Sequence, residues 1–229
     1  MSELFSIQLQ DQQQSSDGVW LDLPTTTEQV QAALRQIGIS SDNPQGLFIS
    51  GYFAEEEKRF AIPYNMVLAS NVDELNFLAS RLETLSAGER AELNAALQVP
   101  QSELSSIGRI TDFPENVDYY VHLPDVRGPA QLGDYYLNRS GMVDMPEEWK
   151  GGIDTAQFGR YVAQQEQGAF TQYGYLVKSG DEWQKVYEGQ PVPEEYRVLS
   201  FPASEILRDA ANIPPPVPVS YTHLRAHET

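Results

Sequence analysis

The chain has 229 residues, no cysteine, and 33 acidic against 15 basic residues, which gives a formal net charge of −18. The missing thiols exclude disulfides, zinc–thiolate sites and cysteine nucleophiles, and the excess of carboxylates disfavours direct binding to nucleic acid or to an anionic membrane. Hydrophobic residues make up 41% of the chain, which is enough to build folded cores.

Residues 1–65 predict a small α+β domain. Alternation of apolar and polar residues predicts three strands, over residues 4–9, 18–23 and 46–53. Thr25 and Glu28 have the spacing of a capping box, and the apolar period that follows predicts an amphipathic helix ending at Gly38. The acidic triplet Glu55–Glu57 follows the third strand and is a candidate contact for a basic partner.

Residues 66–110 predict a helical domain. Two helix starts are indicated by capping-box spacings, Asn71 with Glu74 and Ser86 with Glu89. A stripe of leucines and alanine at helical spacing predicts the buried core of a small helical bundle, whose helices are joined by short connections. A third short helix is expected through Glu103, Leu104 and Ile107.

Residues 111–201 predict a second α+β domain. Helices are expected over residues 130–138 and 155–166, the second packing through Phe158, Tyr161 and Val162. Alternation or apolar runs predict four strands, over residues 117–122, 170–177, 183–187 and 196–201. Residues 142–146 are expected to form a loop.

We expect no signal peptide at the N-terminus. The N-terminus lacks the basic and apolar parts of a signal peptide, and no apolar run reaches the ~18 residues that span a membrane. We therefore expect a cytoplasmic protein without a membrane partner.

Residues 202–218 are proline-rich and predict an extended segment that leaves the fold. Residues 219–229, VSYTHLRAHET, resemble the translation of a transposase adapter and are expected to be non-native, which leaves His122 as the single native histidine.

The sequence contains none of the common catalytic or nucleotide-binding motifs, whether G-x-S-x-G, H-E-x-x-H, GxxxxGK[ST] or GxGxxG. His122 lies in a predicted strand, where packing is the usual role, and the adjacent Glu147 and Glu148 point apart and form no glycosidase pair. No calcium loop is present. We expect no enzymatic activity, no metal and no cofactor.

Acidic residues are concentrated between residues 112 and 154. This range contains nine acidic residues and only three basic ones, Arg127, Arg139 and Lys150, which gives a local net charge of −6. Such a surface attracts the basic grooves with which proteins hold DNA. The predicted contact residues are Asp112, Glu115, Asp118, Asp125, Asp134, Asp144, Glu147, Glu148 and Asp154.

Six segments, in unchanged order from about residue 4 to residue 201, resemble the ArdA family of antirestriction proteins, which mimic DNA. They are GVWLDLP (18–24), FISGYF (48–53), NVDELNFLASRL (71–82), QLGDYYLNRSGMVDMPEE (131–148), IDTAQFGRYVAQQEQGAFTQYGYLV (153–177) and VPEEYRV (192–198).

The resemblance implies an elongated chain of three small domains, α+β, helical and α+β, joined as a homodimer through the C-terminal domains. It also implies an acidic face that occupies the DNA groove of type I restriction-modification enzymes. The family's antirestriction motif region maps to Leu132, Gly133, Asp134, Tyr135 and Tyr136. The dimer interface would lie in or near residues 153–177, where the candidate aromatic residues are Phe158, Tyr161, Phe170, Tyr173 and Tyr175.

Two alternatives remain open at the level of sequence. One is an acidic adaptor that binds another basic, DNA-binding host protein. The other is a hydrolase with a hidden pair of carboxylates, for which raised carboxyl pKa values in a closed pocket would be the sign.

Overall fold

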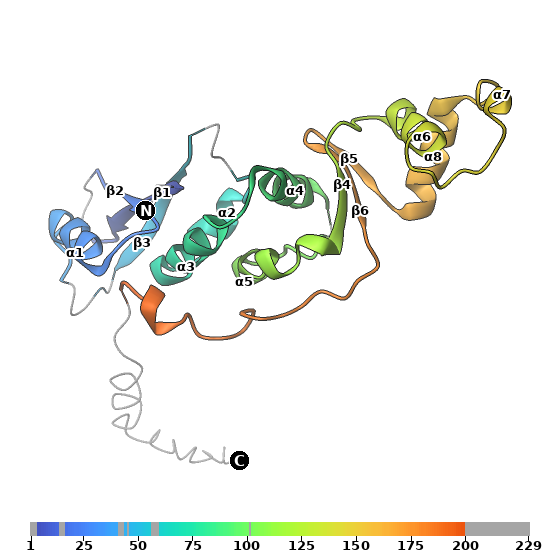
Figure 1. Ribbon diagram of the computed structural model, residues 1–229. Coiled ribbons are helices and arrows are strands. Elements are labelled where there is room, and N and C mark those ends of the chain that lie inside the picture. The colour runs from blue at the N-terminus through green and yellow to red at the C-terminus, as the bar shows by residue number, and fades with distance from the viewer. Residues whose placement is uncertain are drawn as a thin grey trace, which may run out of the picture. The chain divides into compact units, whose positions relative to one another are not determined.

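The computed structural model (Figure 1) describes residues 4–13, 17–40, 44, 46–55, 60–100 and 102–199. Residues up to Leu199 cluster as one compact unit. The predictions for residues 202–218 and 219–229 lie outside the described residues, and so do Glu56 and Glu57 of the acidic triplet. The elements are mixed helices and small antiparallel sheets, which confirms the predicted α+β class.

The N-terminal sheet has the strand order β2-β1-β3, with both pairs antiparallel. Its strands are β1 (Phe5–Asp11), β2 (Val19–Leu23) and β3 (Leu47–Phe53), close to the predicted ranges. Phe5, Ile7 and Leu9 alternate into the core, as the period of two requires. Helix α1 (Thr27–Gln36) follows β2 and ends before Gly38, whose φ of +78° suits a residue without a side chain.

The cap of α1 lies one residue later than predicted. Thr26, not Thr25, accepts a hydrogen bond from the backbone of Gln29, whose side chain completes the capping box. The reason is a contact distant in sequence: the Thr25 backbone N–H donates to Asn76 Oδ1 at 2.7 Å. Because Thr25 is buried against that side chain, the next threonine is left to cap the helix.

The middle region consists of helices α2 (Tyr64–Leu68), α3 (Val72–Leu82), α4 (Ala87–Gln98) and α5 (Ile107–Thr111). The capping boxes at Asn71 and Ser86 are confirmed. The third predicted helix begins later than expected, because Ser106 caps it by accepting the Arg109 N–H.

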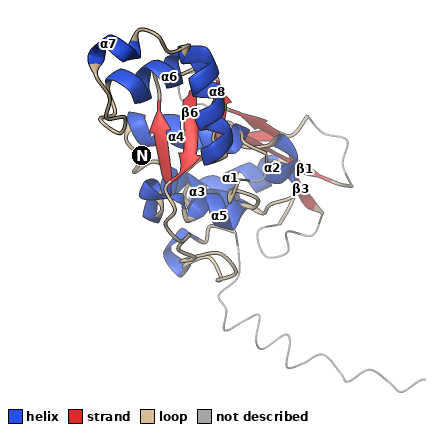
Figure 2. Ribbon diagram, turned by 90° about the vertical axis from the view of Figure 1, so that its right-hand side faces the viewer, coloured by secondary structure: helices blue, strands red, loops and turns tan. Residues whose placement is uncertain are grey.

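The C-terminal region differs most from the prediction. Residues 117–119 form a 3-10 turn and only Tyr120–Leu123 forms strand β4. The predicted strand over residues 170–177 is a hairpin of β5 (Ala169–Thr171) and β6 (Gly174–Lys178), which turns where Gly174 has a φ of +131°. The sheet order is β4-β6-β5. Helices α6 (Pro129–Asn138), α7 (Glu147–Lys150) and α8 (Thr155–Glu166) complete the region, and α6 packs on α8 (Figure 2).

The strands predicted over residues 183–187 and 196–201 are wrong within the described residues, and residues 200 and 201 are not described. Instead, residues 179–199 form an extended segment, here called the C-terminal strap, which contains the 3-10 turn Glu194–Tyr196 and runs along the middle helices (Figure 1). Buried side chains hold its backbone. Asp112 Oδ1 accepts the Tyr187 N–H at 2.6 Å, Asp73 Oδ1 accepts the Val198 N–H at 2.7 Å, and Asn116 Oδ1 accepts the Gln184 N–H at 2.7 Å.

One large hydrophobic cluster runs from Leu4 to Val198 and includes side chains of the N-terminal sheet, the middle helices and β4. A second, smaller cluster lies around α6, α8 and the hairpin and is centred on Val126, Leu132, Ala163 and Tyr175. The large cluster crosses both predicted domain boundaries, so the three-domain division at residues 65 and 110 stays a prediction.

Candidate functional site

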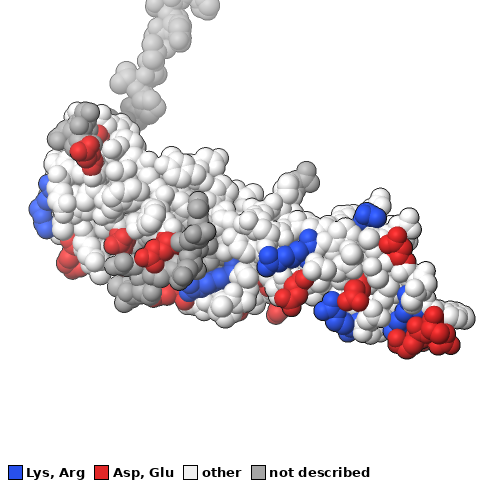
Figure 3. Space-filling view, turned by 90° about the horizontal axis from the view of Figure 1, so that it is seen from above, with Lys and Arg blue, Asp and Glu red and all other residues white. Residues whose placement is uncertain are grey.

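The nine predicted contact acids fall into three environments. The exposed ones are Asp118, Asp125, Asp144, Glu147, Glu148 and Asp154. Glu115 and Asp134 are half-buried, and Asp112 is fully buried. On the face shown in Figure 3, acidic side chains are interspersed with lysines and arginines, so the local pairing of each carboxylate decides how much charge a partner meets.

Asp112 must be removed from the predicted surface. It is 0% exposed, and its two carboxylate oxygens accept the backbone N–H groups of Tyr187 and Glu188 at 2.6 and 3.3 Å. A buried charge is tolerated when hydrogen bonds replace its water. This carboxylate therefore holds the C-terminal strap and is not available to a partner.

Four more of the acids are engaged within the chain. Glu115 pairs with Arg81, Asp134 with Arg139 at 2.8 Å, and Glu147 with Lys150 at 2.7 Å. Asp154 caps α8 by accepting the N–H groups of Ala156 and Gln157. The pKa of Asp134 is lowered by hydrogen bonds from Asn138 and then from Arg139, so it stays ionised but its charge is partly compensated.

The remaining acids are Asp118, Asp125, Asp144 and Glu148, here called the open carboxylates. Each is exposed, and none has a hydrogen-bond or ion-pair partner in the described part of the chain. Two come from the segments around β4, and two come from the segment between α6 and α8. These four side chains offer uncompensated negative charge to a basic surface.

The predicted motif region lies on α6 and is mainly architectural. Leu132 and Gly133 are buried, and a Cβ on Gly133 would lie 2.0 Å from the Thr155 carbonyl oxygen. Across the same crossing, a Cβ on Gly159 would lie 1.8 Å from the Pro129 carbonyl oxygen. The two glycines therefore allow α6 and α8 to approach at backbone contact.

The two tyrosines of the motif region are half-buried and make contacts within the chain. The Tyr136 hydroxyl donates to Glu166, which also accepts the Tyr175 hydroxyl at 3.0 Å. The ring of Tyr135 packs edge-on against that of Tyr136, with 5.5 Å between centroids. Burial, followed by donation to Glu166, raises the pKa of Tyr136, so this hydroxyl remains a donor at neutral pH.

The predicted dimer aromatics are not equally available. Tyr175 is fully buried in the second cluster, and Phe170 packs against it at 4.9 Å between centroids, so Tyr175 must be removed from a contact surface. Tyr173 packs against the large cluster. Phe158 is half-buried, whereas Tyr161 is 60% exposed. The predicted packing of α8 through Tyr161 is wrong, because Gly159 and Ala163 form its buried face.

One unusual carboxyl was not predicted. Glu92 on α4 is half-buried, and its Oε1 has no hydrogen-bond partner among the residues that the structure describes. Burial first, and then the nearby charges of Glu89 and Asp118, raise the pKa of Glu92 to about 8. The sequence signal was its position one turn after Glu89 of the α4 capping box, on the same side of the helix, whereas the closeness of Asp118 follows from the fold. Asp118 is exposed and the Glu89 carboxylate is engaged in the α4 capping box, so the three carboxyls do not share a closed pocket.

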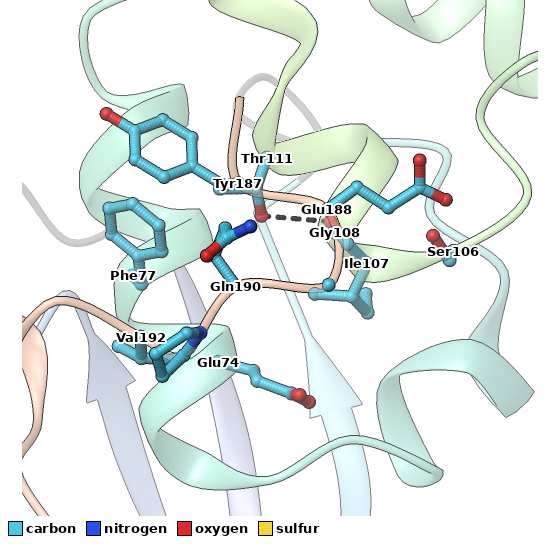
Figure 4. Close-up of a pocket in the computed structure, with 12 residues that line it drawn as sticks. Glu74, Phe77, Ser106, Ile107, Gly108, Thr111, Tyr187, Glu188, Gln190 and Val192 are labelled. Atoms are coloured by element: carbon cyan, nitrogen blue, oxygen red, sulfur yellow. Dashed lines mark hydrogen bonds between the residues drawn. The ribbon is translucent and has the colours of Figure 1, made fainter. Parts of the chain in front are cut away.

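A cavity of about 340 Å³ lies between the C-terminal strap and helices α3 and α5 (Figure 4). Three of its polar side chains are already engaged: Glu188 pairs with Arg109 at 2.9 Å, Glu74 belongs to the α3 cap, and the Thr111 hydroxyl donates to the Ile107 carbonyl. This arrangement is typical of a gap between packed segments.

Among the described residues, no group of three or more potential ligands could hold a metal ion, and no helix is both long and apolar enough to cross a membrane.

The sequence model of the antirestriction protein family ArdA matches residues 14–177 of the chain. The chain belongs to the ArdA family. The match includes the open carboxylates, the motif region on α6 and the whole α6–α8 pair, and it stops just before the C-terminal strap. No curated protein shows significant similarity to the chain. Membership in the ArdA family makes antirestriction the functional class, and a restriction-modification enzyme is the partner that this class implies.

Proposed function

We propose that the chain is a non-enzymatic antirestriction protein whose acidic surface occupies the DNA-binding groove of a type I restriction-modification enzyme. The observation that carries the proposal is the set of four open carboxylates within a chain of net charge −18 that belongs to the ArdA family. A basic groove that binds DNA by neutralising phosphates offers the same positive charge to carboxylates.

Such mimicry copies the charge of the DNA backbone and not its base edges. Carboxylates present no donor and acceptor pattern of the kind that specifies sequence. We therefore expect inhibition to be independent of the recognition sequence of the restriction enzyme. Because most of the attraction is between exposed charges, the complex should form quickly, and its affinity should fall as salt is added.

The proposed assembly is a homodimer. Tyr161 on α8 is the most exposed of the predicted interface aromatics, and it lies on the face of α8 opposite the buried Gly159 and Ala163. An exposed tyrosine on a helix surface is a common element of protein interfaces. Light scattering at micromolar concentration should give the mass of two chains, and a monomer would contradict this part of the proposal.

The central test is a competition experiment with a purified type I enzyme, its labelled DNA and increasing amounts of this protein. The proposal predicts that DNA is displaced and that displacement requires more protein at higher salt. Full DNA occupancy with the protein in excess would reject it. If other basic DNA-binding proteins are displaced from DNA equally well, the adaptor alternative is favoured instead.

A further inference from the structure

Trp149 is an exposed aromatic side chain with no evident structural role in its own chain. It is 66% exposed and lies on α7, in the segment that joins α6 to α8. The other two tryptophans differ. Trp20 packs on Phe53 and covers Gly51, and Trp183 packs on Tyr119 at 5.1 Å. No ring or hydrogen-bond partner holds Trp149 in the described structure, although an indole normally contributes a large buried area.

The backbone that carries Trp149 is well supported. The Trp149 N–H donates to the Pro146 carbonyl, and the Trp149 carbonyl accepts the Gly152 N–H, both at 3.0 Å. Lys150 is turned inward, with a side chain only 16% exposed, and bonds to Glu147. The segment begins and ends on the closely packed α6–α8 pair. A side chain presented by such an ordered turn loses little freedom when it binds a partner.

The charges around Trp149 indicate the kind of partner. Glu148 is adjacent in sequence and Asp144 precedes it in the same segment, and both are open carboxylates. An indole face attracts a cation more strongly than other rings do, and a carboxylate binds a guanidinium through two parallel hydrogen bonds. An arginine suits both features, because its planar group can stack on a ring and its charge is attracted by exposed acids.

A second copy of this chain is a poorer occupant. In a symmetric pair both subunits use the same surface patch, so a patch centred on Trp149 would bring Glu148 and Asp144 close to the same acids of the second copy. Like charges placed together across an interface are destabilising. The acidic surroundings of Trp149 therefore favour a basic partner.

We propose that Trp149 is an anchor residue that stacks on an arginine of the partner's DNA-binding groove, and that the negative charges of Glu148 and Asp144 in the same segment attract this arginine. This inference rests on the proposed function and names a residue that determines affinity within it. Ordinary DNA mimicry requires only charge. A stacked ring adds an apolar contact that DNA phosphates do not make, so part of the affinity should survive when salt screens the carboxylates.

The test measures the affinity of the protein for the type I enzyme at several salt concentrations, by the competition experiment described above. Trp149→Ala should weaken binding about tenfold or more at every salt concentration, as expected for a tryptophan hot spot. Its salt dependence should parallel that of the wild type. Glu148→Gln should instead flatten the salt dependence, and Trp149→Phe should lie between Trp149→Ala and the wild type.

Trp20→Ala is the matched control, because Trp20 is also largely exposed, at 49%, but has no open carboxylate beside it in sequence. The affinity of the Trp20→Ala variant for the type I enzyme should stay within twofold of that of the wild type. Wild-type affinity of Trp149→Ala at all salt concentrations would overturn the inference while leaving the proposed function intact. So would loss of the dimer in this variant by sedimentation, which would assign Trp149 to contact with a second copy. A wild-type protein that leaves the DNA in place would overturn both.

Discussion

At the scale of single residues, the most informative side chains are polar and buried. Asp73, Asn76, Asp112 and Asn116 are all at most 4% exposed, and each accepts or donates a hydrogen bond to the backbone of a distant segment. Buried polar groups of this kind are costly unless they are paired. Their pairing explains why the C-terminal strap follows one path although it forms no sheet within the described residues.

Replacing Asp112 with alanine should destabilise the fold. The change empties a buried position and leaves the partly buried N–H groups of Tyr187 and Glu188 without their acceptor, and the expected loss in the free energy of unfolding is about 3 kcal/mol. Urea unfolding measures it. The control is Asp118→Ala, an exposed acid from the same predicted set, which should change stability by less than about 0.5 kcal/mol. Equal losses in the two variants would contradict the assignment of Asp112 as a structural residue.

Glu92 should make the stability of the protein depend on pH. Its pKa is raised from 4.5 to about 8 in the folded state, so the folded state keeps a proton that the unfolded state releases. The free energy of unfolding should therefore fall as the pH rises from 4.5 to 8. Because solvent screens this half-buried group, we expect the free energy of unfolding to fall by about 1 kcal/mol, which is less than the whole pKa shift would give.

Glu92→Gln should remove this pH dependence, because the amide does not ionise. The variant should be more stable than the wild type above pH 8 and similar to it near pH 4.5. Urea unfolding midpoints across this range provide the measurement. Parallel curves for the two proteins would show that Glu92 titrates normally.

At the scale of elements, the crossing of α6 and α8 determines how the acidic segment between them is presented. The crossing depends on Gly133 and Gly159, where added side chains would collide with backbone atoms of the other helix. The segment from Arg139 to Asp154 starts at the C-terminus of α6 and ends at the cap of α8. The crossing therefore fixes the two ends of the segment that carries Asp144, Glu148 and Trp149.

Gly159→Ala should destabilise the protein although alanine favours a helix. Alanine gains about 1 kcal/mol in helix propensity, but its Cβ would lie 1.8 Å from the Pro129 carbonyl oxygen, so the helices must separate. Overpacking of this kind costs about 3 kcal/mol, and the net loss should appear as a lower Tm.

The control for this substitution is Gly151→Ala. Gly151 has a φ of −64°, and no described atom lies within 4 Å of an added Cβ. The Tm of the Gly151→Ala variant should therefore be unchanged or slightly raised. A Gly159→Ala variant as stable as Gly151→Ala would show that α6 and α8 do not meet at backbone contact.

At the scale of the whole molecule, the placement of charge should matter more than its amount. The chain carries −18 in total, yet several acids of the predicted surface are paired with arginine or lysine or act as helix caps. Paired charges on a surface contribute little at a distance because their fields cancel. The open carboxylates are therefore the acids that a basic groove meets first.

Neutralising all four open carboxylates, by Asp→Asn at 118, 125 and 144 and Glu→Gln at 148, should weaken inhibition of the type I enzyme and flatten its salt dependence. A matched variant removes the same charge elsewhere, at the exposed residues Asp17, Glu182, Glu194 and Glu195. Competition with labelled DNA at two salt concentrations compares the two variants. Equal effects would mean that total charge, and not the placement of the open carboxylates, controls binding.

Local features were predictable from sequence because they depend on residues within one or two turns. The capping boxes at Asn71 and Ser86 and the bounds of α8 are confirmed, since their hydrogen bonds close over three or four residues. The strands predicted over residues 183–187 and 196–201 failed because the strap pairs with side chains and not with a neighbouring strand. An alternating pattern does not reveal which partner a backbone will find.

Composition and motif order were sufficient to determine the acidic character, the α+β class and the family of the chain. Only the tertiary structure decided which acids a partner can meet. Asp112 and Asp118 are six positions apart and look equivalent in sequence, yet the first is enclosed by Tyr187, 75 residues away, and the second faces solvent. The reason is physical: a carboxylate is neutralised or buried by groups that the fold brings to it, and those groups lie far along the chain.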